Sequence, residues 1–194
     1  MPRFYLWIVS VLSLAFLAVG LAVAQTAPAA PKAADSGPSL AVTMQFIQEG
    51  LSQLGQVNYA AYNYDNADGT RWTTQFSTVD TNVVADAAAC RISYHEKRTK
   101  DGSVTSDTDY WFSLHEVKDV IVEPREKLLK KVNTANGHPS WDAKIGPPIT
   151  MLLARKAENT EWYFYFLDED QANRVAKAMT HAVELCGGGN KDPF

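Results

Sequence analysis

Residues 161–189, EWYFYFLDEDQANRVAKAMTHAVELCGGG, constrain the fold more than any other part of this chain. Residues 162–167 are aromatic or apolar without interruption, which favours a strand packed on both faces. Asp168 follows at a position suited to an N-cap, and the apolar residues among 172–186 recur at spacings of three and four. Gly187 then supplies a helix stop. The segment therefore predicts a buried strand followed by an amphipathic helix.

The N-terminus has the features of an export signal. Arg3 precedes an apolar run over residues 6–23, and residues 22–24 show the small-x-small pattern that signal peptidase cleaves. We expect residues 1–24 to be a signal peptide, which directs the protein to the periplasm or the cell exterior. The run is long for a signal, so an uncleaved membrane anchor is the alternative, and it would be the protein's contact with a membrane.

The rest of the chain divides into a linker, one domain and a tail. Residues 25–39 are rich in Ala and Pro and predict a disordered linker. Residues 40–187 are enough for one domain with its own core, and residues 188–194 are expected to be a disordered tail. The formal net charge of −4 argues against a nucleic-acid partner, because such proteins need a basic face.

The chain has two cysteines, Cys90 and Cys186. An exported protein with an even number of cysteines usually pairs them, so we expect a disulfide between these two residues. Two buried free thiols are the alternative. A redox motif is excluded because the sequence has no C-x-x-C.

The remaining periodicities predict an antiparallel domain. Residues 40–54 have the spacing of an amphipathic helix that Ser39 caps and Gly55 ends, and we expect it to dock on its own domain. A second helix is expected after Pro124, followed by a loop over residues 138–148. The expected strands are residues 57–64, 71–79, 90–97, a partner through 110–114, 117–122, 149–155 and 162–167.

Short blocks of the sequence resemble a known family. They are NVVAD at residues 82–86 leading to CRISY at 90–94, GHPSW at 137–141, and a block from Asn173 to Gly188. They are similar to small, uncharacterised bacterial secreted proteins with a pleckstrin-homology-like (PH-like) domain. The resemblance implies an α+β fold: a bent antiparallel β-barrel or sandwich of about seven strands, capped by the C-terminal amphipathic helix, with an extra N-terminal helix. It brings no established activity.

PH domains that bind phosphoinositides place Lys and Arg around their first hairpin. This chain carries Asp65 and Asp68 in that turn instead. The one basic turn, Lys97, Arg98 and Lys100, could contact anionic lipid or sugar, but a solvated charged turn is the favoured interpretation.

Catalytic, cofactor and metal motifs are not visible in the sequence. The four histidines have no ligand spacing, and neither HExxH nor GxSxG occurs. The aspartates of the turns do not form a calcium loop, because the twelve-residue pattern with a terminal Glu is missing. We therefore expect no enzyme activity, no cofactor and no metal.

Trp141 and His138 are the candidate partner-binding residues. Both are expected in the loop over residues 138–148, where the indole would either plug the end of the barrel or anchor a partner. The sequence thus favours a non-catalytic extracytoplasmic binding or scaffold module that contacts a protein or a cell-envelope component. The alternative is a small-ligand or lipid carrier, or an enzyme, with a pocket between the C-terminal helix and the sheet.

Overall fold

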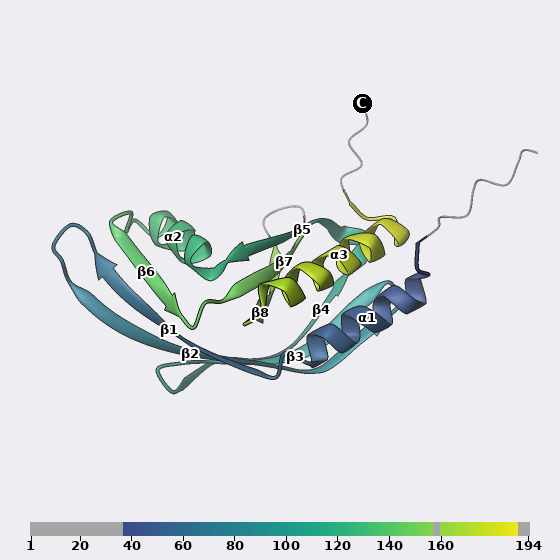
Figure 1. Cartoon of the computed structure of the whole chain (residues 1–194), viewed down its shortest axis with the longest axis horizontal. Helices are drawn as coiled ribbons and strands as arrows, with labels where there is room; N and C mark the ends of the chain where they lie inside the picture. The colour runs from purple at the N-terminus through teal and green to yellow at the C-terminus, as the bar shows by residue number, and fades with distance from the viewer. Residues whose placement is uncertain (1–36, 157–159, 190–194) are drawn as a thin grey trace, which may run out of the picture. The chain divides into compact units, whose positions relative to one another are not determined.

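The computed structural model describes residues 37–156 and 160–189, and this part of the chain contains eight strands and three α-helices (Figure 1). The predicted signal peptide, most of the predicted linker and residues 190–194 lie outside the described residues. The elements are α1 (Leu40–Ser52), β1 (Gln56–Asp65), β2 (Arg71–Asp86), β3 (Arg91–Lys100), β4 (Ser103–Ser113), β5 (Val117–Pro124), α2 (Arg125–Ala135), β6 (Trp141–Gly146), β7 (Thr150–Lys156), β8 (Glu161–Phe166) and α3 (Glu169–Leu185).

The strands form two separate antiparallel sheets. The long sheet has the order β4-β3-β2-β1-β6, and the short sheet has the order β5-β7-β8. The expected α+β class is confirmed, but the strands do not close into a single barrel. Figure 1 shows α1 and α3 side by side at one end of the long sheet and α2 beside β6 at the other end.

The short sheet has buried residues on both faces, which confirms the predicted packing for Phe164–Phe166, whereas residues 162 and 163 are half-buried and Leu167 lies beyond β8 and is 58% exposed. On one face, Leu152 and Phe164 join the apolar cluster around α1, α3 and the β3–β4 hairpin. On the other face, Leu153 and Tyr165 join a second cluster with β1, β6 and α2. Burial on both faces explains why β8, an edge strand of this sheet, shows no alternation of apolar and polar residues.

The two long helices begin as their sequences predict, and α3 also ends as predicted, whereas α1 ends at Ser52, before the expected stop at Gly55. The Asp168 side chain accepts hydrogen bonds from the backbone at the start of α3, and Gly187 ends this helix with φ of 76°. The α1 helix is capped by Ser39 and packs on α3, so its expected docking is confirmed. The closest approach is at Gly50, where an added Cβ would lie 2.7 Å from Cγ2 of Val175.

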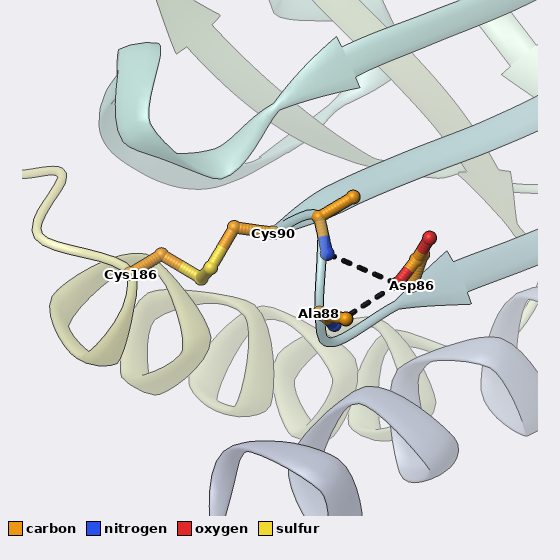
Figure 2. Close-up of a disulfide and its surroundings, with 5 residues drawn as sticks. Asp86, Ala88, Cys90 and Cys186 are labelled. Carbon is orange, nitrogen blue, oxygen red and sulfur yellow. Dashed lines mark hydrogen bonds between the residues drawn. A yellow bond between two sulfur atoms is a disulfide. The ribbon is translucent and has the colours of Figure 1, made fainter.

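A disulfide joins Cys90 to Cys186, as predicted, and ties the end of α3 to the start of β3 (Figure 2). The two Cα atoms lie 5.9 Å apart, within the usual range. The Asp86 carboxylate accepts hydrogen bonds from the backbone of Ala88 and Ala89 and shapes the turn before Cys90. The bond is compatible with an oxidising compartment.

Two predictions about the strands and loops need correction. The segment over residues 138–148 is not a loop throughout, because Trp141–Gly146 forms β6. The prolines of this segment flank the strand instead of interrupting it. At those positions the lack of a backbone N–H removes no hydrogen bond of the sheet. The β2 strand continues beyond the predicted end at Val79 to Asp86, with a bulge near Asn82, whose φ is 54°.

Candidate functional site

Polar side chains occupy inward-facing positions of β2 and β3, between the two sheets. Asp80 is 6% exposed and Glu96 is fully buried. Carboxyl groups rarely lie so deep unless a charge partner or a function holds them there. We call this region the inter-sheet polar site; its residues are Tyr59, Thr78, Asp80, Glu96, Arg98, Lys100, Arg125 and Tyr165.

Asp80 and Glu96 form a pair of buried carboxyl groups. They are cross-strand partners in the β2–β3 register, a position in which side chains lie on the same face and close together. Burial and, second, the charge of Glu96 raise the pKa of Asp80 to about 7. Two neighbouring carboxylates resist simultaneous ionisation, so near neutral pH the pair holds part of a proton.

Arg98 compensates the charge of Glu96. Its Nη2 atom lies 2.5 Å from Oε2 of Glu96, and this ion pair assigns the ionised carboxylate to Glu96 and the proton to Asp80. Among the described residues, Oδ1 of Asp80 and Oε1 of Glu96 are buried without a hydrogen-bond partner. The acid pair therefore stays under-satisfied even with Arg98 in place.

A second guanidinium group approaches Arg98 from α2. The Cζ atoms of Arg98 and Arg125 lie 5.4 and 5.5 Å from the centre of the Tyr165 ring. Arg125 is the first residue of α2, so the packing of that helix positions it. Within residues 37–156 and 160–189, Arg125 has no carboxylate within ion-pair distance. The Nε atoms of both arginines are buried without a hydrogen-bond partner in this part of the chain.

The two arginines line a cavity of about 240 Å³. Its walls come from both sheets and from α2, and the residues are Tyr59, Phe76, Thr78, Arg98, Thr99, Lys100, Thr105, Arg125 and Tyr165. Tyr59, Thr78 and Tyr165 are buried, whereas Lys100 and Thr105 are exposed on the β3–β4 hairpin. The cavity thus leads from a polar rim to a buried wall that presents hydroxyl and guanidinium groups.

The acid pair does not line this cavity. Asp80 lies one inward-facing position after Thr78 in β2, and Glu96 lies one inward-facing position before Arg98 in β3. Their contact with the cavity runs through Arg98, which Glu96 holds in place. The arrangement can bind an anion through two guanidinium groups, while the carboxyl groups position Arg98 without touching the bound molecule.

The basic turn predicted around Lys97, Arg98 and Lys100 is wrong for Arg98. That residue is in β3 and points between the sheets, where it meets Glu96 and Tyr165. Lys97 faces the other way and lies 3.8 Å from Asp107. The strand alternation separates Lys97 from Arg98 and Lys100, which share a face and line the same cavity.

Trp141 and His138, the candidate partner-binding residues, lie together at the far end of the long sheet. The His138 ring stacks on the indole at 3.7 Å, and the indole nitrogen donates to Oδ2 of Asp65 at 2.9 Å. Trp72 meets Trp141 edge to face, with ring centres 5.0 Å apart. Trp141 is half-buried as the first residue of β6, and His138 is exposed. Binding of a partner here stays a prediction.

His95 is another ionisable group with close partners. Its Nδ1 and Nε2 atoms lie 2.8 and 2.9 Å from the carboxylates of Asp109 and Asp107. Chiefly the hydrogen bond to Asp109 raises the pKa of His95. Neither this cluster nor any other group in the described part has the arrangement of three or more His, Cys, Asp or Glu side chains that would hold a metal ion.

The residues of the inter-sheet polar site were missed because their strands were interpreted without register. The available signal was the alternation itself: Thr74, Phe76, Thr78 and Asp80 share one face of β2. In β3, Ile92 and Tyr94 share their face with Glu96 and Arg98. Charged residues in phase with a core face indicate a buried polar site.

Comparison with known proteins assigns neither a family nor a ligand to this site. No protein-family model, no curated protein and no solved structure matches the chain. Across residues 37–156 and 160–189, the helices are too short or too polar to cross a bilayer.

Proposed function

We propose that this protein is a non-catalytic extracytoplasmic binding module that takes a small carboxylate or phosphate ligand into the inter-sheet polar site. The observation that carries the proposal is the convergence of Arg98 and Arg125 over Tyr165 at the wall of a cavity. Guanidinium groups are the preferred partners of carboxylates and phosphates because they offer several donors in one plane.

The charges of the site favour an anionic ligand. Arg98, Arg125 and Lys100 stand against the ionised Glu96, while the raised pKa of Asp80 keeps that carboxyl partly protonated near neutral pH. The site therefore has an excess of positive charge in a partly desolvated position, where an incoming anion gains more than at the surface. A volume of about 240 Å³ suits a small ligand.

Export is supported by two features. The Cys90–Cys186 disulfide suits an oxidising compartment, and the apolar run over residues 6–23 has the pattern of a secretion signal. The proposed ligands are accordingly molecules of the periplasm or the cell exterior, free or displayed by the envelope.

Membership in the secreted PH-like family is also a proposal. A run of antiparallel strands followed by a C-terminal amphipathic helix supports it, whereas the separate sheets differ from a closed barrel. An experimental structure of a member with the same strand order and the same disulfide would support the relation; a different strand order would count against it.

An enzyme is the second candidate, because two buried carboxyl groups with raised pKa values resemble an acid–base pair. The position of the pair speaks against this function, since neither carboxyl lines the cavity. A general acid or base must lie within hydrogen-bond reach of the reacting group.

Titration calorimetry at low salt tests the binding function with inorganic phosphate, acetate and citrate as probes. Arg125→Gln removes a guanidinium group that has no ion-pair partner in the described part, so the fold should survive the change. We expect a loss of affinity of at least about tenfold, because charged hydrogen bonds contribute about 1.5 to 3 kcal/mol. The control Arg91→Gln changes an exposed arginine of β3 and should bind as the wild type does. Equal affinity in Arg125→Gln, or no binding of any probe to the wild type, would refute the proposal.

A further inference from the structure

The outer face of the long sheet carries an exposed tyrosine beside a glycine of the neighbouring strand. Tyr62 is in β1, and 53% of its surface is exposed. An added Cβ at Gly146 would lie 3.1 Å from Cε2 of Tyr62, so the glycine of β6 leaves room for the ring. The ring therefore turns an edge toward the glycine, and more than half of the residue's surface is open to solvent.

Cationic side chains lie on the two strands that neighbour β1. In the register, Tyr62 is opposite Thr73 of β2 and Lys144 of β6, and Tyr64 is opposite Arg71. Strands lie about 4.8 Å apart, so the strands of Arg71 and Lys144 are separated by about 10 Å, with the tyrosines between them. The outer-face platform, as we call it, is the group Tyr62, Tyr64, Arg71, Thr73 and Lys144.

The platform lines a hollow of about 530 Å³, and its cations are not neutralised nearby. Within residues 37–156 and 160–189, neither Arg71 nor Lys144 has a carboxylate within 4.0 Å. Asp142, which is opposite Tyr64, is engaged by Lys130 at 3.2 Å. The platform is thus an open aromatic surface with two free positive charges.

The platform differs from the inter-sheet site in its width and in its exposure to solvent. The inter-sheet cavity is narrow and reaches a buried wall, whereas the platform is a wide hollow on an exposed sheet face. An exposed ring attracts the weakly positive C–H groups of a flat ligand through its negative face. A sugar ring has such a face, and carboxylates on the sugar would meet Arg71 and Lys144.

Other occupants agree less well with these observations. Nucleic acid also stacks on aromatic rings, but its phosphates are bound by a basic face with many Lys and Arg side chains, whereas the platform carries two, Arg71 and Lys144. An amphipathic helix would place its apolar face over Arg71 and Lys144 and leave both cations without a partner. We propose that the outer-face platform binds an acidic polysaccharide, with a sugar ring stacked on Tyr62 and carboxylates paired with Arg71 and Lys144.

The test uses the full exported domain and oligogalacturonate as the acidic probe. Affinity is measured by titration calorimetry, with a neutral maltooligosaccharide and polyglutamate as comparison ligands. The wild type should bind oligogalacturonate more tightly than either comparison ligand. Tyr62→Ala should weaken binding about tenfold, and Tyr62→Phe should retain it because the ring stays.

Control variants separate the platform from general effects. Trp111→Ala removes another exposed aromatic side chain, which is 61% exposed, and should leave the affinity unchanged. Arg125→Gln should also leave it unchanged, so failure of the inter-sheet proposal would not affect this one. Equal affinity for polyglutamate and oligogalacturonate would overturn the proposal, as would wild-type affinity in a folded Tyr62→Ala variant.

Discussion

Replacement of Asp80 by Asn probes the buried acid pair through the pH dependence of stability. Burial and Glu96 raise the pKa of Asp80 from 3.8 to about 7 in the folded state. At pH values between these two pKa values, Asp80 is protonated in the folded protein and ionised in the unfolded chain. The free energy of unfolding therefore falls as the pH rises from about 4 to about 7, and the full cost is present above that range.

The size of the effect follows from the shift. Raising the pKa from 3.8 to about 7 corresponds to about 4 kcal/mol, because each pKa unit contributes about 1.36 kcal/mol. Asn has nearly the same shape as Asp and carries no charge. Asp80→Asn should match the wild type near pH 4 and be more stable by up to about 4 kcal/mol at pH 8, less any lost hydrogen bonding.

Urea denaturation between pH 4 and pH 8 measures this difference for wild type and variant. The matched control, Glu49→Gln, makes the same kind of change at an exposed carboxyl on α1 and measures the effect of a surface substitution at each pH. A constant difference between Asp80→Asn and the wild type would show that Asp80 titrates normally. A variant less stable than the wild type at pH 8 would show that ionised Asp80 has a favourable partner, and both results would refute the assigned charge state.

Three further changes test the packing. Removal of the Cys90–Cys186 bond by double substitution with Ala should lower the free energy of unfolding by about 4 to 5 kcal/mol, because the bond closes a loop with a sequence separation of 96; unchanged urea unfolding would contradict this. Trp141→Ala should cost about 2 kcal/mol, since the half-buried indole packs against Trp72 and His138, whereas Trp111→Ala should change stability by less than about 0.5 kcal/mol. Gly50→Ala should lower the thermal midpoint because its methyl group meets Val175, and the added change Val175→Ala should relieve part of that loss; two independent, additive effects would contradict the close approach.

The elements that could be predicted from the sequence are those in which local pattern and tertiary burial agree. The strand over residues 162–167 and α3 combine an apolar run, a cap, a periodic stripe and a glycine stop, and all four features are present in the structure. The disulfide followed from the number of cysteines and the export signal. In β6 the two levels disagree, because its flanking prolines and glycine indicate a loop while its strand pairing depends on β1, far away in the sequence.

The inter-sheet polar site could not be predicted from the sequence, because only tertiary packing brings its residues together. Arg98 and Arg125 lie in different elements, and only the packing of the short sheet between them brings both guanidinium groups over Tyr165. No local spacing encodes that meeting. The one local signal is that Glu96 and Arg98 alternate in step with the core-facing residues of β3. This signal is recognisable only when the strand register is known, and the interpretation of Lys97 and Lys100 as a basic turn hid it.

The cost of the acid pair bears on what the site is for. Buried ion pairs can often be replaced by apolar residues of similar volume without loss of stability, so Asp80, Glu96 and Arg98 are poorly explained as stabilising elements. Glu96 pairs with Nη2 of Arg98, and the remaining donors of that guanidinium group can bind a ligand in the cavity. If the pair exists to position Arg98, then Glu96→Gln should weaken phosphate binding, and it should also lower stability because the Arg98 charge loses its carboxylate partner. A folded variant that keeps its affinity would separate the acid pair from the binding function.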